Sequence, residues 1–137
     1  MSHVFSTLSV ATSGMGAYKT WLNAVADNVA NMDNVVKTTD PAFQERFVQV
    51  EAIEDPYGTD TGGGARVVAA QFGDPNGILA YEPNNPLADE NGMIRRPDVD
   101  LTEQMVYLQL AQRGYQANVS TFDRAKEAYE SALQIGQ

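Results

Sequence analysis

The sequence predicts an α+β fold: an antiparallel, coiled-coil-like pair of long N- and C-terminal helices with a small β-rich or extended middle region. Near both ends of the chain, apolar residues recur at steps of three and four, which places them on one face of a helix. In the C-terminal stretch they also recur at every seventh residue, the repeat of a helix that supercoils with a partner. The middle shows short alternations of apolar and polar residues, the period of a strand.

The first helix is predicted to run to about residue 34, after a start at 1–6 that we expect to be frayed. Ser6, Thr7 and Ser9 are candidate caps for its beginning. The helix is expected to stop among asparagines, because this residue tolerates the left-handed turn that ends helices. Its first apolar row consists of Val4, Leu8, Ala11, Met15, Tyr18, Leu22, Val25, Val29 and Met32.

A second row follows the same helix on roughly the opposite side. It consists of Val10, Gly14, Ala17, Trp21, Ala24, Asn28 and Asn31. These residues are small or uncharged, and one is the only tryptophan of the chain. A helix that is apolar on most sides is normally buried on most sides. Because the partner helix covers only one face, we expect other chains to cover the second row.

The middle region is predicted to contain three strands, at 47–52, 66–72 and 78–81. A flexible, acidic and glycine-rich loop is predicted at 54–64, and the pair Asn76-Gly77 predicts a hairpin between the last two strands. Proline and turn-forming residues follow at 82–92, which we expect to be extended. The predicted parts are an N-terminal helix at 1–35, a β-rich and extended middle at 36–98, and a C-terminal helix at 99–137.

The C-terminal helix is predicted to run for about 35 residues, or roughly 50 Å. Asp100 or Thr102 is the candidate cap, and Glu103 in the first turn suits the helix dipole. Its apolar row consists of Leu101, Met105, Leu108, Ala111, Tyr115, Val119, Phe122, Ala125, Tyr129 and Leu133. Within this row Leu101, Leu108, Tyr115, Phe122 and Tyr129 lie seven residues apart. A weaker second row consists of Val106, Leu110, Ala117, Ala128, Ala132 and Ile135.

Composition excludes several classes of function. The formal net charge of −9 argues against nucleic-acid binding and against docking on an anionic membrane. Cysteine is absent, which excludes disulfides, thiolate catalysis and most zinc sites. The sequence has neither a run of about 18 apolar residues nor a basic start followed by an apolar run, so we expect no membrane span and no cleavable secretion signal.

Chemical motifs point away from catalysis. Gly62-Gly63-Gly64 lacks the Lys-Ser/Thr of a phosphate loop and reads as a linker. His3 is the only histidine and lies in the expected frayed start, where it could not be held for a catalytic relay. The many carboxylates do not follow the spacing of a calcium loop. We therefore expect no enzyme activity, no cofactor, no metal and no small-molecule substrate.

Several motifs carry a resemblance to a known family. The first helix contains Ser13-Gly14-Met15 and Ala26-Asp27-Asn28-Val29-Ala30-Asn31. Later come Pro83-Asn84-Asn85-Pro86-Leu87-Ala88-Asp89, Gly92, Arg96-Pro97-Asp98-Val99-Asp100, Glu103-Gln104-Met105 and Arg113-Gly114-Tyr115-Gln116-Ala117-Asn118. In this order they resemble the bacterial flagellar rod, hook and filament-axis family, and the short chain is most similar to its proximal-rod members. Asn85 and Asp98 depart from the His and Asn that are usual there, and 32–36 departs from the usual Thr and Pro-Gly.

The resemblance implies a structural subunit of the proximal rod that assembles through its terminal helices and transmits torque. It implies other rod proteins, the protein joining the rod to the MS ring, the surrounding basal-body rings and the flagellar export apparatus as partners. The expected location is the periplasmic rod, reached by type III export without cleavage. The alternative is a soluble coiled-coil adaptor or secretion chaperone, which shares the amphipathic ends but does not need the second row.

The expected assembly interface draws on both helices. It comprises Leu8, Met15, Tyr18, Trp21, Leu22, Val25, Asn28, Val29, Asn31, Met105, Leu108, Tyr115, Asn118, Phe122 and Tyr129. For Trp21 an interface anchor and a core position have equal weight. Asn28 and Asn118 are expected to form hydrogen bonds where helices meet, as polar residues that fix register do.

Overall fold

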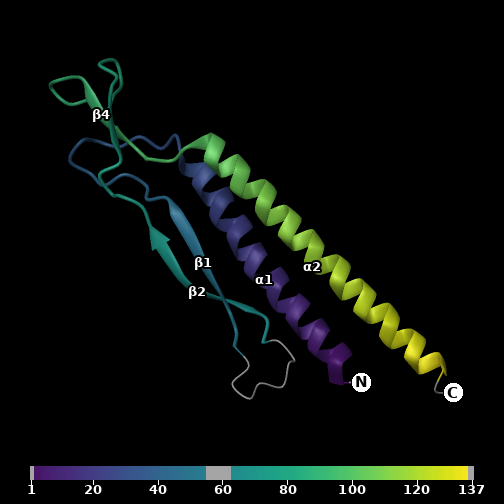
Figure 1. Cartoon of the computed structure of the whole chain (residues 1–137). Coiled ribbons are helices and arrows are strands. Elements are labelled where there is room, and N and C mark those ends of the chain that lie inside the picture. Colours follow the sequence, from purple (N-terminus) through teal and green to yellow (C-terminus); the bar gives the residue numbers. More distant parts are fainter. Residues whose placement is uncertain (1, 55–62, 136–137) are drawn as a thin grey trace. The chain divides into compact units, whose positions relative to one another are not determined.

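The computed structural model describes residues 2–54 and 63–135 (Figure 1). Its elements in chain order are α1 (Ser2–Asn31), β1 (Arg46–Ala52), β2 (Ala65–Phe72), β3 (Ile78–Tyr81), β4 (Met93–Arg96) and α2 (Leu101–Ile135). Two long terminal helices and short antiparallel strands confirm the predicted α+β class. The loop predicted at 54–64 lies mostly outside the described residues.

The chain forms two compact units, each built from both helices and the strands. The first unit comprises Met1–Leu22, Gln49–Ala69 and Gln109–Gln137, and the second comprises Asn23–Val48 and Ala70–Leu108. The division predicted from the sequence, with boundaries near 35 and 98, stays a prediction about domain organisation.

Within each unit, α1 and α2 contribute facing segments that run in opposite directions. In the first unit the rings of Phe5 and Tyr129 meet edge to face with their centroids 5.3 Å apart, and Tyr18 lies against Gly114. In the second unit the side-chain amides of Asn28 and Gln104 are hydrogen-bonded. Later residues of α1 therefore meet earlier residues of α2, as expected for an antiparallel pair.

The observed start of α1 differs from the prediction. The helix begins at Ser2, so the start expected to be frayed is helical. Thr7 does not cap it, because its Oγ1 donates to the carbonyl of His3 at 2.9 Å, a bond within the helix. The helix ends at Asn31, where the backbone N–H of Asn34 donates to the Asn31 carbonyl at 3.1 Å.

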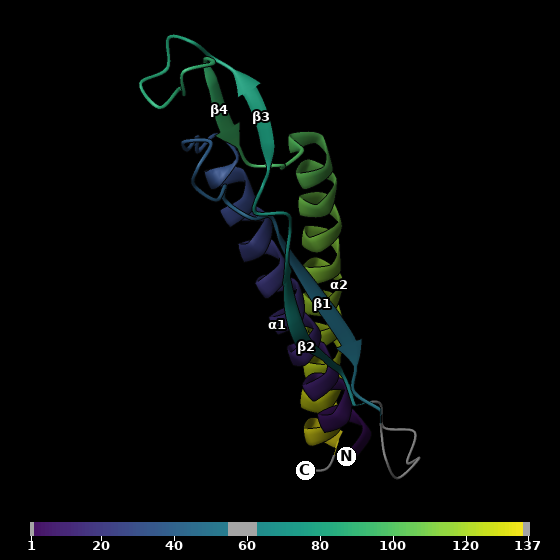
Figure 2. The ribbon, with the colours of Figure 1, turned by 90° about the vertical axis from the view of Figure 1, so that its left-hand side faces the viewer.

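The strands form two separate two-stranded sheets, β1 with β2 and β3 with β4 (Figure 2). The three predicted strands correspond to β1, β2 and β3, whereas β4 lies where the sequence predicted no strand. Just after α1, Val36 adds an isolated antiparallel bridge to Arg95 of β4. The segment after Asn31, where the sequence departs from the family that it resembles, thus adds a bridge to the second sheet.

The hairpin predicted at Asn76-Gly77 is wrong, although the turn itself forms. Asn76 N donates to Asp74 Oδ1 at 2.8 Å, and Gly77 has a positive φ of 51°. The turn joins strands of different sheets, because β3 pairs with β4 instead of β2. A side chain at Gly77 would lie 2.1 Å from the Arg96 carbonyl, so the close approach of β4 requires glycine here.

Burial along α1 reverses the expected roles of its two rows. The second row supplies most of the buried residues, namely Gly14, Ala17, Ala24 and Asn28, whereas the first row supplies Ala11 and Val25. The expectation that other chains must cover the second row is therefore wrong at these positions. Two neighbours cover it within the chain, since residues of α2 and residues near β1 and β2 contact it from different sides.

On α2 the predicted apolar row is buried at some positions only. The buried residues of this helix also recur every seven positions, but they are Gln104, Ala111 and Ala125, with Asn118 half-buried. Ala111 and Ala125 belong to the predicted row, whereas its heptad members Leu101, Leu108, Tyr115, Phe122 and Tyr129 are half-buried, apart from the exposed Leu101. Small residues occupy the contact line because the backbones approach closely, and the large side chains pack along its border.

Candidate assembly surface

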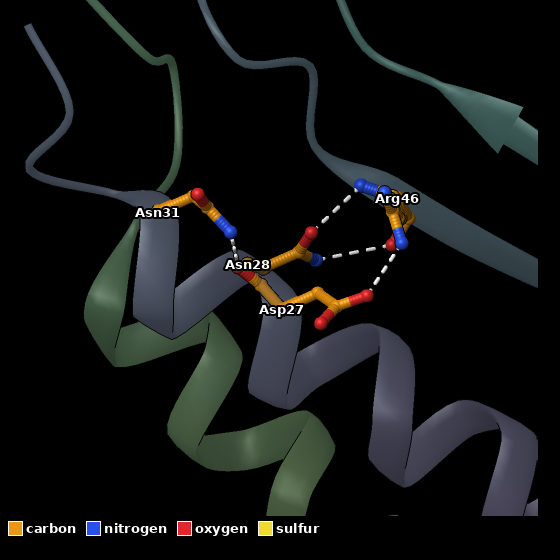
Figure 3. A network of polar contacts seen from close by, with 4 residues as sticks. All are labelled: Asp27, Asn28, Asn31 and Arg46. Atoms are coloured by element: carbon orange, nitrogen blue, oxygen red, sulfur yellow. Dashed lines mark hydrogen bonds and ion pairs between the residues drawn. The ribbon is translucent and has the colours of Figure 1, made fainter.

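A polar cluster in the second unit fixes the start of β1 on α1 (Figure 3). Arg46 N donates to Asn28 Oδ1 at 2.8 Å, and Asn28 Nδ2 donates to the Arg46 carbonyl at 3.0 Å. The Asn28 amide thus pairs with one residue of β1 as a neighbouring strand would. The Arg46 guanidinium forms an ion pair with Asp27, and Asn31 Nδ2 donates to the Asp27 carbonyl at 2.8 Å. This arrangement gives the Asp27-Asn28 motif a structural role inside the chain.

Gln104 extends this cluster to α2. Its Oε1 accepts from Asn28 Nδ2 at 3.0 Å, and its Nε2 donates to Glu45 Oε1 at 2.6 Å. Gln104 and Asn28 are 0% and 1% exposed, so both amides depend on these bonds. Burial raises the pKa of Glu45; the Gln104 hydrogen bond opposes this, and the nearby negative charges of Glu103, Asp98 and Asp100 add to it.

In the first unit, Ser13 plays the equivalent role for β2. Its Oγ accepts from the backbone N–H of Ala65 at 3.0 Å and donates to the Val10 carbonyl at 2.8 Å. The preceding residue, Gly64, has a φ of 88°, and a Cβ there would lie 2.2 Å from Ser13 Oγ. Ser13 of the Ser13-Gly14 motif therefore anchors the start of β2 to α1.

Gly14, the second residue of that motif, permits the close approach of the helices. A Cβ on Gly14 would lie 2.3 Å from Asn118 Oδ1, and one on Gly114 would lie 2.3 Å from the Tyr18 ring. Asn118 is held in place because its Nδ2 donates to the Gly114 carbonyl at 2.8 Å. Tyr18 in turn stacks on Trp21, with centroids 6.2 Å apart. These motif residues build the helix pair of one chain.

The predicted interface residues fall into three groups by exposure. Val25 and Asn28 are buried within the chain. The half-buried ones are Leu8, Met15, Tyr18, Trp21, Leu22, Asn31, Leu108, Tyr115, Asn118, Phe122 and Tyr129. Only Val29 and Met105 are exposed. Whether the exposed and half-buried members contact another chain stays a prediction, and Asn28 instead forms the internal contacts described above.

Sequence reasoning did not place several exposed apolar residues in the interface. On the helices these are Phe5, Leu101, Val106, Leu110, Leu133 and Ile135. Val106 and Leu110 belong to the weaker second row of the C-terminal helix, which was the signal for an outward apolar face. The strands expose further apolar side chains, including Phe72, Ile78, Leu79 and Tyr81.

Within residues 2–54 and 63–135 there is no group of three or more His, Asp or Glu side chains suited to a metal ion. The described parts of α1 and α2 are also not apolar enough over a sufficient length to cross a membrane.

Comparisons with known proteins identify the family. The family model for the C-terminal region of flagellar basal body rod FlgEFG proteins matches residues 90–135, which contain β4 and α2. The flagellar basal-body rod protein FlgC of Salmonella typhimurium is 34% identical over 136 residues, covering 98% of both chains. The chain belongs to the FlgC family of flagellar basal-body rod proteins. FlgC of Yersinia enterocolitica is 35% identical, and FlgC of Aquifex aeolicus is 32% identical, each over 98% of both chains.

Membership in the FlgC family makes this chain a structural protein of the flagellar basal body. The alternative of a coiled-coil adaptor or secretion chaperone finds no support in these comparisons. The two residues that depart from the family pattern have defined surroundings in the second unit. Asn85 Oδ1 accepts from Leu87 N at 3.0 Å in a tight turn, and Asp98 is one of the carboxylates that raise the pKa of Glu45.

Proposed function

We propose that this chain builds the rod by packing the outward faces of α1 and α2 against further copies and other rod proteins. The sparse charge on these faces carries the proposal. In a chain of formal charge −9, α1 contains only Lys19 and Asp27 besides His3. Among the exposed residues between 101 and 121 of α2, Glu103 and Arg113 are the charged ones. Low charge at exposed apolar side chains is typical of surfaces that become buried on association.

Gly16 adds a specific indication on α1. It is exposed in the middle of the helix, and a Cβ there would meet nothing within 4 Å. Glycine in a helix costs roughly 0.5–1 kcal/mol relative to alanine, and the chain's own packing does not require it here. At the other two helix glycines, Gly14 and Gly114, a residue of the neighbouring helix occupies the space that a side chain would need. We infer that Gly16 leaves room for a helix of another subunit.

Two threonines beside Gly16 make the same face apolar. Thr12 Oγ1 donates to the Leu8 carbonyl at 2.8 Å, and Thr20 Oγ1 donates to the Gly16 carbonyl at 3.1 Å. Because these hydroxyls bond to the helix's own backbone, their methyl groups remain to face outward. The result is a surface of small side chains on α1, with the exposed Lys19 beside it. The bulkier Val106 and Leu110 on α2 are suited to pack against such a surface.

Packing between two different faces is heterologous, and where the rotation between subunits does not close a ring it continues into a helical assembly. A rod made in this way would transmit torque through helices held on several sides. The partners implied by the family resemblance are other rod proteins, the protein joining the rod to the MS ring, the surrounding rings and the export apparatus. The proposed location is the periplasmic part of the basal body, after export without cleavage.

The test replaces Gly16 with leucine. Leucine is a better helix former than glycine at an exposed position, so the purified Gly16→Leu chain should keep its helix content and unfold at the same or a higher midpoint. In cells lacking the native protein, this variant should fail to enter purified basal bodies and should not restore swimming. Glu127→Leu places the same leucine side chain at an exposed position in the charged part of α2. As the control, this variant should enter basal bodies and restore swimming. Normal incorporation of Gly16→Leu would refute the proposed packing.

A further inference from the structure

The sheet of β3 and β4 has one covered edge and one open edge, and both belong to the second unit (Figure 2). On the covered edge, Arg95 N donates to the Val36 carbonyl at 3.0 Å, and Val36 N donates to the Arg95 carbonyl at 2.9 Å. Arg95 lies directly opposite Leu79 of β3 in the register. Because its backbone groups are bonded to Val36, they point away from β3.

The same alternation fixes which backbone groups of β3 point outward. Glu82 N donates to the Gly92 carbonyl at 2.8 Å, so this pair is bonded across the sheet. In an antiparallel ladder, bonded and non-bonded pairs alternate. Ala80, opposite Ile94, is therefore bonded to β4, whereas the backbone groups of Leu79 and Tyr81 point to the open edge. In the part of the chain that the structure describes, no turn or loop supplies a backbone partner to these two residues.

This open edge lacks the features that normally prevent strand pairing. The residues of β3 are Ile, Leu, Ala and Tyr, with no charge and no proline. Leu79 is 52% exposed and Tyr81 is 69% exposed, while Ile94 of β4 is fully buried beneath the sheet. Natural edge strands are usually protected by lysine, proline, a bulge or a covering segment. An uncharged, anchored and uncovered edge is suited to accept one more strand.

Charge distinguishes the possible partners. The second unit holds eleven carboxylates against four Lys and Arg residues, a balance of −7 out of the chain's −9. Both arginines of β4 are engaged within the chain: Arg95 Nη2 donates to the Thr38 carbonyl at 2.6 Å, and Arg96 forms ion pairs with Asp33 and Glu82. A second copy of this unit would meet strong like-charge repulsion, whereas a basic segment would be attracted.

We propose that the open edge of β3 binds an extended, lysine- or arginine-bearing segment of a different protein as a third strand. The main-chain groups of Leu79 and Tyr81 would bond to it, and the acidic surroundings would favour its positive side chains. This surface is separate from the outward faces of α1 and α2. Its failure in a test would leave the proposed helix packing untouched, and the reverse also holds.

The test uses the full chain and two synthetic seven-residue peptides, one alternating valine with lysine and one alternating valine with glutamate. The lysine peptide should bind and slow hydrogen exchange at the amides of Leu79 and Tyr81. Its affinity should fall as salt is raised, because the attraction is partly between exposed charges. The glutamate peptide should bind at least about tenfold more weakly, as expected for a reversed charge pattern. Equal binding of the two peptides, or protection at other amides only, would overturn the proposal.

Two substitutions of Leu79 test separately the contribution of its backbone N–H and the effect of charge at the edge. Leu79→Pro removes the outward N–H without breaking a bond to β4, so the sheet should remain and peptide affinity should fall about tenfold. Leu79→Lys keeps the N–H but adds an edge lysine, and it should weaken binding of the lysine peptide while sparing the fold. Ala80→Pro removes an N–H that faces β4 and should disrupt the sheet. If Leu79→Pro disrupted it equally, the assigned open edge would be wrong; unchanged affinity in Leu79→Lys would also contradict the proposal.

Discussion

Asn28 and Gln104 lie 76 residues apart in sequence, yet their buried amides are joined by a hydrogen bond of 3.0 Å. Each amide also holds a third segment, since Asn28 pairs with the backbone of Arg46 and Gln104 donates to Glu45. One polar cluster therefore connects α1, α2 and the start of β1. Buried networks of this kind specify a unique arrangement only when every member is satisfied.

Asn28→Ala should destabilise the chain by about 2–4 kcal/mol, because it leaves the buried Gln104 Oε1 and the part-buried Arg46 N–H without their partner. Urea unfolding followed by circular dichroism measures this loss. Asn34→Ala is the matched control, since Asn34 donates only an exposed side-chain bond to Asn31, and it should change stability by less than about 0.5 kcal/mol. Similar losses in the two variants would mean that the cluster does not stabilise the fold.

The sequence predicted the helices and three strands because their periods are local properties. It also predicted hydrogen bonding by Asn28 and Asn118 at helix contacts. Asn28 forms such a bond with Gln104, whereas Asn118 lies at the contact with Gly14 but donates to Gly114 of its own helix. It did not predict that the second row of α1 is the more buried one, or that Gln104 lies on the buried line of α2 together with the predicted Ala111 and Ala125. Which positions are buried depends on how closely the backbones approach, and Gly14 and Gly114 permit a separation at which small residues fill the contact line.

The features that the sequence did not predict depend on residues that lie far apart in the chain. The β4 strand contains Arg95 and Arg96, whose charges hide a strand pattern, and it exists because β3 and Val36 pair with it. The Asn76-Gly77 turn was recognised correctly, but a turn motif alone does not choose between β2 and β4 as the partner of β3. Glu45 was not singled out, since nothing local shows that Gln104 would bury it.

Ser13 and Gly64 should show coupled effects on stability. Ser13→Ala leaves the Ala65 N–H without its acceptor and should cost about 1–2 kcal/mol. Gly64→Ala places a methyl group 2.2 Å from Ser13 Oγ at a φ of 88° and should cost more, about 2–4 kcal/mol. In the double variant the clash is relieved while the backbone strain remains. Its loss of stability should therefore be smaller than the sum of the losses in the two single variants. Additive losses in urea unfolding would show that the two residues do not interact.

The three helix glycines should respond differently to alanine. At Gly14 and Gly114 the new methyl group would lie 2.3 Å from Asn118 and from the Tyr18 ring, so each change should destabilise the purified chain by about 1–3 kcal/mol. At Gly16 the new methyl group would meet nothing within 4 Å, so Gly16→Ala should stabilise the purified chain by roughly 0.5–1 kcal/mol. Thermal unfolding of the three variants provides the comparison. A stabilising effect at Gly14 or Gly114 would contradict the close helix approach.

Glu45 should make the stability of the chain depend on pH in an unusual direction for a carboxylate. Burial raises its pKa above the usual 4.5, so the folded state holds the proton more tightly than the unfolded state. Its contribution to stability is fully present below that value and is lost as pH rises through the folded pKa. Glu45→Gln stays neutral and keeps an oxygen that can accept from Gln104. The stability of this variant relative to the native chain should therefore grow as pH rises from about 4 to about 7.

Two further substitutions check the cause of this pH dependence. Asp98→Asn removes one of the like charges that raise the pKa of Glu45, so it should shift the native profile in the same direction as Glu45→Gln, but less. Asp89 has the opposite behaviour, because backbone hydrogen bonds from Met93 and Asn91 lower its pKa. Its contribution is present above the unfolded pKa and is lost as pH falls through the folded one, so Asp89→Asn should remove stability at neutral pH. Urea unfolding at several pH values distinguishes these profiles, and a native profile that Glu45→Gln leaves unchanged would exclude Glu45 as its source.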